Sequence, residues 1–298
     1  MSNNSPEGAG IALMMIGGAF TYLGLKNFRK SRKIQDTARI DIASAPQGLV
    51  EVEGYAWPLE PSFAAVCGRQ VVYYNYKVQE LVKRDKDSSW ETRYEFNHNA
   101  SFYVIDQSGV CIVNPAKDSM DITEKITKLD FYAETIEALS QSSRQKSGWL
   151  GKIFSGTYRL VEHKLFVGSP VYICGNLQAM NLNQVKIRGD YKKFLTQIKT
   201  MNANPIFKMS KLDANRDGVL SDDEMIGGIA DLSKDIAASS VEIETKLAGT
   251  ISSSEAHNLI VADGHQEQYL KRLTSFNLLK IWGGAALICA GLFYFFAR

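Results

Sequence analysis

The sequence lacks a clear excess of charge of either sign. Its 34 Lys and Arg residues against 32 Asp and Glu leave a formal net charge of +2 over 298 residues. A surface that binds nucleic acid normally carries a marked basic excess, because it neutralises phosphates, so we expect no nucleic-acid partner.

The Walker A, G-x-G-x-x-G, H-E-x-x-H and G-x-S-x-G motifs are absent as well. No catalytic residue is indicated, and an enzymatic activity of the chain itself has no support in the sequence.

Cysteines are few, and their spacing is not that of a metal site. They are Cys67, Cys111, Cys174 and Cys289, and no two of them form a C-x-x-C pair. Cys289 lies in an apolar run near the C-terminus, which leaves an odd number in the rest of the chain. This pattern argues against both a disulfide framework and a zinc site. Free thiols in a reducing compartment are the simplest interpretation.

Two long apolar runs lie near the ends of the chain. Residues 8–25 carry no charged side chain and are long enough to cross a bilayer with little tilt. A basic stretch, residues 26–33, follows them. The second run, residues 278–297, comes after Lys271 and Arg272 and contains aromatic residues that suit a membrane interface. We expect a transmembrane helix at each run; a secretory signal peptide fits the first run less well, because no Lys or Arg precedes it.

The basic residues adjoin both runs on the side of the segment between them. Under the positive-inside rule this arrangement predicts an integral membrane protein with two spans and a cytoplasmic central domain. A calcium loop of moderate affinity would meet more calcium outside a cell, so the periplasmic or intermembrane-space side stays an alternative. The basic stretch after the first run fits either a topology signal or a contact with anionic lipid.

The segment between the runs is rich in strand patterns. Alternating apolar and polar residues, with many Val and Tyr, predict β-strands in residues 48–54, 69–82, 101–115, 156–178 and 257–263. Residues 121–143 are expected to be partly helical. Glu51, Glu53 and Glu162 are interpreted as outward-facing strand residues.

These blocks resemble the GIDE-type domain in their order along the chain. The resemblance rests on five segments: GLVEVEGYAWP, CGRQVVYYNYKVQE, FYVIDQSGVCIVNP, YRLVEHKLFVGSPVYICGNL and NLIVADGHQEQYLKRL. In mitochondrial outer-membrane ubiquitin ligases, a domain of this type sits between two spans and a zinc-binding RING follows the second. This chain has no Cys and His at RING spacing. The resemblance therefore implies a membrane-anchored β-rich interaction or scaffold domain and does not carry over ligase activity.

The stretch DANRDGVLSDDE, residues 213–224, has the pattern of an EF-hand calcium loop. Such a loop supplies oxygen ligands at positions 1, 3, 5, 7, 9 and 12 and has Gly at position 6. Gly218 occupies position 6. The predicted Ca²⁺ ligands are Asp213, Asn215, Asp217, Val219 through its carbonyl, Ser221 and Glu224. A helix-turn-helix with an acidic turn, or a loop that binds calcium too weakly to matter, are the competing interpretations.

Apolar residues at helical spacing flank this loop. They are Ile206, Met209 and Leu212 before it and Met225, Ile229 and Leu232 after it. No second EF-hand loop is found, so the first must pack on the β domain, pair with a second subunit or dock another protein. The expected divisions are a GIDE-like β-rich domain at 34–182, a helical insertion at 183–256, and the end of the GIDE-like domain at 257–270.

The predicted fold class is α+β: two transmembrane helices flanking a mainly antiparallel β domain, with an inserted helical EF-hand segment. The expected function is a membrane-anchored calcium-binding scaffold or adaptor. Its expected partners are the lipid bilayer and an unknown protein, or a second copy through the EF-hand. The alternative is a non-catalytic subunit of an E3 ubiquitin ligase-like or other enzyme complex, with catalysis in a partner chain. Calcium would either switch the helices or only stiffen the insertion.

Overall fold

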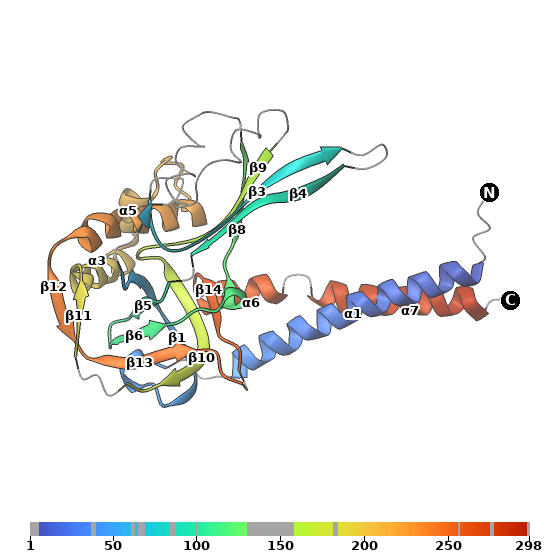
Figure 1. Ribbon diagram of the computed structural model, residues 1–298, viewed down its shortest axis with the longest axis horizontal. Coiled ribbons are helices and arrows are strands. Elements are labelled where there is room, and N and C mark those ends of the chain that lie inside the picture. Colours follow the sequence, from blue (N-terminus) through green and yellow to red (C-terminus); the bar gives the residue numbers. More distant parts are fainter. Residues whose placement is uncertain are drawn as a thin grey trace. The chain divides into compact units, whose positions relative to one another are not determined.

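The structure is a computed structural model and consists of two compact units. It describes residues 6–36, 40–60, 63–64, 69–83, 88–98, 100–129, 158–180, 184–255, 257–274 and 277–296. The anchor unit comprises Met1–Ala38 and His265–Arg298, and the central unit comprises Arg39–Gly264. Figure 1 shows both, and each is described here by itself.

The anchor unit is a pair of long helices with one short helix. They are α1 (Pro6–Asp36), α6 (Gln266–Thr274) and α7 (Asn277–Phe296). α1 and α7 run antiparallel side by side, with the two chain ends at the same end of the pair (Figure 1). Glycines recur every seven residues on α1, about two helical turns, and a Cβ added at Gly17 would lie 2.6 Å from the Gly284 carbonyl oxygen. Glycine therefore lets the two backbones approach closely.

The structure gives one candidate membrane span where two were expected. Among the described residues, the stretch Gln266–Phe295, which comprises α6 and most of α7, is long and apolar enough, by length and composition, to cross a membrane. The apolar part of α1, Gly10–Lys26, falls short of that length. Because a helix rises about 1.5 Å per residue, this part of α1 is shorter than a bilayer core of about 30 Å.

The central unit contains a seven-stranded and a five-stranded sheet. Its strands are β1 (Gly48–Pro58), β2 (Phe63–Ala64), β3 (Gln70–Lys83), β4 (Ser88–His98), β5 (Phe102–Ile105), β6 (Val110–Val113), β7 (Met120–Asp121), β8 (Glu124–Leu129), β9 (Tyr158–Phe166), β10 (Pro170–Gln178), β11 (Val185–Arg188), β12 (Glu242–Thr245), β13 (Leu247–Ser252) and β14 (Ile260–Asp263). Short 3-10 turns lie at Ile42–Ser44 and Lys117–Ser119. The strand blocks predicted from alternation are all present, and the β-rich α+β class is confirmed.

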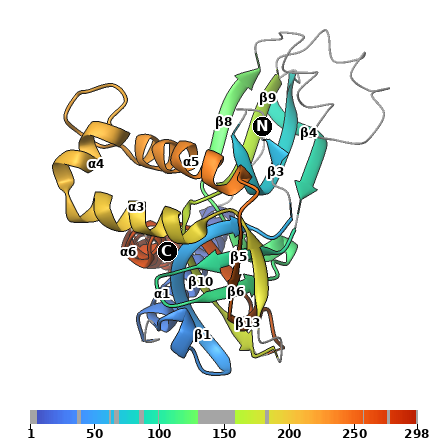
Figure 2. The ribbon, with the colours of Figure 1, turned by 90° about the vertical axis from the view of Figure 1, so that its left-hand side faces the viewer.

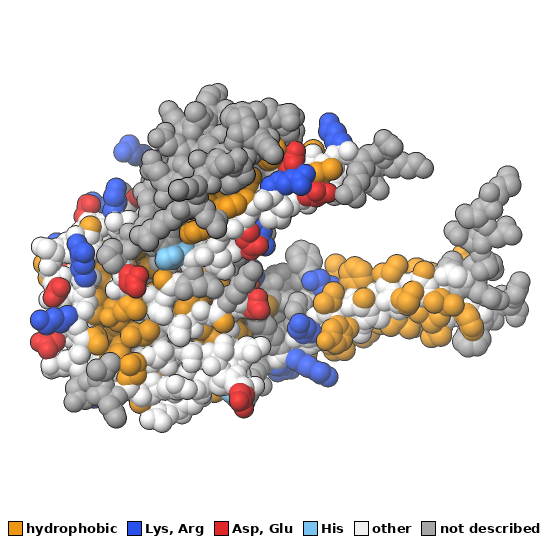
Figure 3. Space-filling model, in the orientation of Figure 1, with side chains coloured by type: hydrophobic (Ala, Val, Ile, Leu, Met, Phe, Trp, Pro, Cys, Tyr) orange, Lys and Arg blue, Asp and Glu red, His pale blue; other side chains and the backbone are white. Residues whose placement is uncertain are grey.

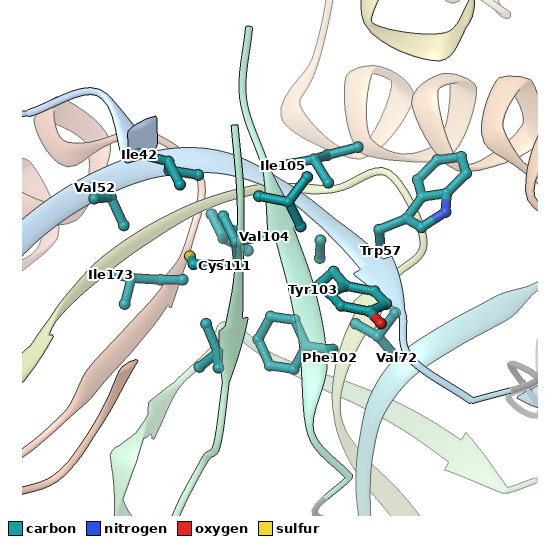
Figure 4. Packing of buried hydrophobic residues seen from close by; sticks show 14 of the residues in the cluster. Ile42, Val52, Trp57, Val72, Phe102, Tyr103, Val104, Ile105, Cys111 and Ile173 are labelled. Carbon is teal, nitrogen blue, oxygen red and sulfur yellow. The ribbon is translucent and has the colours of Figure 1, made fainter. Parts of the chain in front are cut away.

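The first sheet closes on itself. Its order is β1-β5-β6-β13-β10-β14-β7, and β10 also pairs with β1, so that β1, β5, β6, β13 and β10 form a ring. Most neighbouring strands are antiparallel, whereas β13 runs parallel to β6 and β14 parallel to β7. The ring has an apolar interior to which β1, β5, β6 and β10 contribute (Figure 4). Burial raises the pKa of the Cys111 thiol inside it, and this cysteine is one of the free thiols expected from the sequence.

The second sheet has the order β2-β3-β9-β8, with β4 paired to β3. One of its strands, β3, contributes several tyrosines. The hydroxyl of one of them, Tyr74, donates a 2.8 Å hydrogen bond to the Glu162 carboxylate. The Lys164 ammonium contacts the other oxygen of that carboxylate at 3.0 Å. The prediction that Glu162 and Glu51 face outward is therefore wrong, since these side chains are 4% and 1% exposed. A lysine and a hydroxyl beside Glu162 offset the cost of burying its charge.

Three helices follow the second sheet along the chain. They are α3 (Tyr191–Ala203), α4 (Pro205–Leu212) and α5 (Asp222–Ala238), arranged in succession on one side of the central unit (Figure 2). The region 183–256, expected as a helical insertion, also contains β11, β12 and β13, and β13 belongs to the main sheet. Residues 124–129, expected within a partly helical segment, form β8. The rest of that expected segment, from residue 130, lies outside the described residues.

Candidate metal centre

The loop 213–224 lies between two capped helices. Before α4, the Asn204 side chain accepts a hydrogen bond from the Phe207 amide, and Pro205 stands in the first turn, where no amide is needed. α5 begins at a capping box: Ser221 accepts from the Glu224 amide, and the Glu224 carboxylate accepts from the Ser221 amide. At the end of α4 that borders the loop, Asp213 is the C-cap and its amide donates to the Met209 carbonyl.

The first three predicted ligands turn their oxygens toward the backbone of the loop. The two carboxylate oxygens of Asp213 accept from the Arg216 amide at 2.7 Å and from the Gly218 amide at 3.0 Å. Asn215 accepts from the Asp217 amide at 2.9 Å. Asp217 in turn accepts from the amide of the residue two positions on, at 2.8 Å. These short-range bonds fold the loop around its own side-chain oxygens.

Glu224 closes the loop from the other end. One of its carboxylate oxygens accepts from the Asn215 amide at 3.2 Å, and the other accepts from the Ser221 hydroxyl at 2.7 Å. The hydrogen bond from the Ser221 side chain, followed by those from the Ser221 and Asn215 amides, lowers the pKa of Glu224. Positions 3, 9 and 12 of the predicted loop are therefore in direct contact.

The backbone of the loop takes left-handed conformations at Arg216 (φ 59°) and Gly218 (φ 81°). A Cβ added at Gly218 would have no heavy atom within 4 Å. Glycine is therefore required there for its backbone conformation and not for space.

Hydrogen bonds join three of the predicted site residues directly, namely Asn215, Ser221 and Glu224. Among the described residues, no group of three or more His, Cys, Asp and Glu side chains is gathered so as to hold a metal ion. In the loop, the carboxylates of Asp213, Asp217 and Glu224 accept hydrogen bonds from backbone amides. The remaining predicted ligands are an amide, a hydroxyl and a carbonyl oxygen, so the donor set consists entirely of oxygen, as a hard cation prefers.

The apolar residues on the two helices differ in burial. Leu212 is 4% exposed and would touch a Cβ placed at Gly228 of α5, whereas Ile206 at the start of α4 is 83% exposed. On α5, Ile229 is part of the main core, and Met225 and Leu232 pack against that core. α5 is therefore attached to the β domain, while α4 is held at its C-terminal end.

Three contacts attach α5 to the β sheets. The buried Ser233 hydroxyl donates a 2.6 Å hydrogen bond to the Val167 carbonyl in the turn between β9 and β10. The next residue, Gly168, has φ 80°, and a Cβ there would lie 2.8 Å from the Ser233 Cβ. At the start of β3, the Arg69 guanidinium forms two 3.0 Å bonds with the Asp231 carboxylate.

Sequence reasoning did not identify these attachment residues. Gly227 and Gly228 on α5 each lie where another side chain approaches closely. A Cβ at Gly227 would lie 3.2 Å from the Arg69 guanidinium, and one at Gly228 would meet Leu212. Paired glycines on a helix of otherwise good helix formers were the available signal of close packing.

The fold and the loop define a mixed α+β protein with a β-rich domain, a helical segment attached to that domain, and a candidate membrane helix. Residues 72–200 match the family model described as "GIDE: E3 Ubiquitin ligase". The stretch that matches the GIDE family model runs from β3 into α3 and ends before the loop 213–224. No curated protein and no solved structure matches the chain.

Proposed function

We propose that the protein is a membrane-anchored calcium-binding scaffold or adaptor, in which an EF-hand is coupled to the GIDE-type domain. The observation that carries the proposal is the closure of the loop 213–224 by Glu224 on the Asn215 amide, directly next to a helix that is fixed to the β domain. A calcium-dependent change in the loop is then transmitted to a surface of the domain that carries the family match.

The cation would be held by the six oxygen donors of the loop. They are the side chains of Asp213, Asn215, Asp217, Ser221 and Glu224 and the carbonyl of Val219. A bound Ca²⁺ supplies a concentrated positive charge that several carboxylates can share without mutual repulsion. The carboxylates already lie within one short loop, which lowers the entropy that binding must remove.

Helix movement on binding would be taken up by α4. α5 is attached by Ser233, Asp231 and its apolar face, whereas the described contacts of α4 with α5 centre on Leu212. The surface that calcium alters is therefore the one that includes Ile206 and Phe207, which are 83% and 39% exposed. A protein partner, or a second copy of this chain, would recognise that surface.

We also propose that α1 and α7 both span the membrane, with the central unit on the cytoplasmic side. Support comes from the glycine contacts that pack α1 along the candidate span, because a short apolar helix is tolerated beside a longer one. A cysteine introduced at the exposed Ser240 tests the side. In sealed cells, a thiol reagent that does not cross membranes should leave it unlabelled; labelling would place the central unit on the periplasmic or intermembrane-space side.

Calorimetry with calcium on the full chain in detergent tests the proposal directly. We expect one binding event, abolished by Asp213→Asn and by Glu224→Gln. Asp235→Asn, which removes an exposed carboxylate of α5 outside the loop, is the matched control and should bind as the wild type does. Absence of binding at millimolar calcium would refute the calcium proposal. Binding without any change in helix content or protease sensitivity would mean that calcium only stiffens the segment.

A second candidate is a non-catalytic subunit of an E3 ubiquitin ligase-like or other enzyme complex. The specific observation in its favour is the family match over residues 72–200. Affinity purification of the full chain from membranes discriminates between the two candidates. Stoichiometric recovery of a zinc-binding or catalytic chain, unaffected by calcium, supports the subunit, whereas a partner retained only with calcium supports the adaptor.

A further inference from the structure

One end of the helix pair in the anchor unit carries a group of exposed basic side chains. They are Lys26, Arg29 and Arg32 on α1 and Lys271 and Arg272 on α6, here called the basic collar. α6 contacts α1, so the two groups lie at the same end of the pair. Figure 3 shows Lys and Arg side chains there, where the hydrophobic surface of the pair stops.

The spacing on α1 places its three basic residues on one side of the helix. Lys26, Arg29 and Arg32 are each three residues apart, which keeps them neighbours on the helix surface over a rise of about 9 Å. The Arg32 guanidinium lies 5.5 Å from the centre of the Phe28 ring, a cation–π contact that holds it along the helix. On α6, the guanidinium of Arg272 lies 5.6 Å from the ring of the buried Tyr269.

The collar adjoins side chains that suit the lipid interior. Leu25 precedes Lys26 and is 40% exposed, and Leu279 and Trp282 on α7 are 70% and 71% exposed. When α7 is inserted, the collar therefore lies at the depth of the lipid headgroups. On α1, residues 26–33 contain no Asp or Glu, whereas on α6 Glu267 lies one turn before Lys271.

We propose that the basic collar binds the headgroups of anionic phospholipids and enriches them around the protein. A neutral bilayer offers the basic collar only water and zwitterionic headgroups, whereas each anionic headgroup can pair with one of its basic side chains. Each basic residue near an anionic membrane surface raises the binding constant by roughly fivefold. The proposal rests on membrane insertion of α7 and is independent of calcium.

Trp282 provides a local reporter for the test. The full chain is reconstituted into phosphatidylcholine vesicles that contain, at the same low mole fraction, either brominated phosphatidylglycerol or brominated phosphatidylcholine. Bromine quenches tryptophan on contact, and Trp282→Phe identifies the contribution of this residue. We expect the anionic lipid to quench Trp282 at least about twofold more strongly. The excess should disappear near 1 M salt, where the screening length falls to about 3 Å.

Two sets of substitutions separate the collar from charge in general. The collar variant combines Arg29→Gln, Arg32→Gln, Lys271→Gln and Arg272→Gln and should show equal quenching by both lipids. The control variant combines Lys192→Gln, Lys193→Gln, Lys199→Gln and Lys246→Gln, all exposed residues of the central unit, and should keep the preference. Equal quenching of the wild-type protein by both lipids would overturn the proposal. Quenching by neither lipid would overturn it together with the insertion of α7.

Discussion

The attachment of α5 to the β sheets can be tested at one glycine. Gly168 has φ 80°, a backbone conformation that costs a residue with a Cβ about 1–2 kcal/mol. In Gly168→Ala the new methyl group would also lie 2.8 Å from the Ser233 Cβ and 3.0 Å from the Phe194 ring. Ser233 is fully buried and bonded to Val167, so its helix cannot move aside freely. Such overpacking costs about 1–3 kcal/mol, and the total expected loss is roughly 2–5 kcal/mol.

Gly218→Ala is the matched control for the backbone part of this cost. Gly218 has φ 81°, but a Cβ there would have no heavy atom within 4 Å. Measured without calcium, its cost should be limited to about 1–2 kcal/mol. The difference between the two variants therefore reports the contact of α5 and α3 with the turn between β9 and β10.

Thermal unfolding of the full chain in detergent, followed by tryptophan fluorescence, provides the assay. Trp57 is fully buried, and its indole donates to the Arg188 carbonyl at 2.9 Å, so it reports on the central unit. A unit of this size loses about 2–4 °C in Tm per kcal/mol, which predicts a drop of about 10 °C for Gly168→Ala and about 4 °C for Gly218→Ala. Equal shifts for the two variants would refute the packing argument. If the Ser233 Cβ is the obstacle, Gly168→Ala should cost less in a Ser233→Gly background than in the wild-type protein.

Three further predictions follow from other contacts. Ser221→Ala should raise the pKa of Glu224 toward its ordinary value, because the Ser221 hydroxyl is the main cause of its lowering. In the wild-type protein, the stability that this carboxylate gives the loop is present above the ordinary pKa and is lost as pH falls through the lowered pKa of the folded state. Carboxyl NMR titration of the wild-type protein and the variant measures the two pKa values. Gly17→Leu should sharply lower the Tm in detergent because the helices of the anchor unit are forced apart, whereas Gly18→Leu, with nothing within 4 Å of an added Cβ, should not. Tyr74→Phe removes the donor to a buried carboxylate of β9 and should cost roughly 1.5–3 kcal/mol in urea unfolding, and an unchanged midpoint would contradict that role.

Strong alternation predicted β3, whereas β13 is among the strands that the sequence did not predict. β3 is rich in Val and Tyr, and the pattern identified it directly. β13 has the sequence LAGTIS, in which Leu247, Gly249 and Ile251 are the buried positions. Gly249 replaces a large apolar side chain because a Cβ there would collide with the Gln178 carbonyl. The close approach that admits β13 to the sheet therefore weakened its signal in the sequence.

The candidate site has two parts, the loop and the attachment of α5, and they differ in how far their contacts reach along the sequence. The loop residues from Asp213 to Glu224 are hydrogen-bonded to one another within twelve positions, so these contacts are local in the sequence. The attachment of α5 joins Ser233 to Val167, 66 residues away, and Arg69 to Asp231, 162 residues away. Such pairs depend on how the sheets are placed, which local patterns do not specify. The buried position of Glu162 has the same origin, because its hydroxyl donor comes from another strand.

The closed ring of strands has a consequence for how the protein is made. β1 ends at Pro58, whereas β13, which completes the ring, begins at Leu247, 189 residues later (247 − 58). At about 5–20 residues per second, a ribosome needs roughly 10–40 s to cover that distance. Until β13 emerges, β6 and β10 each lack the neighbour that joins them, and an unpaired strand edge readily pairs with other chains. Slowed translation between β10 and β13 should therefore increase aggregation of the nascent chain more than slowing at any point within the anchor unit.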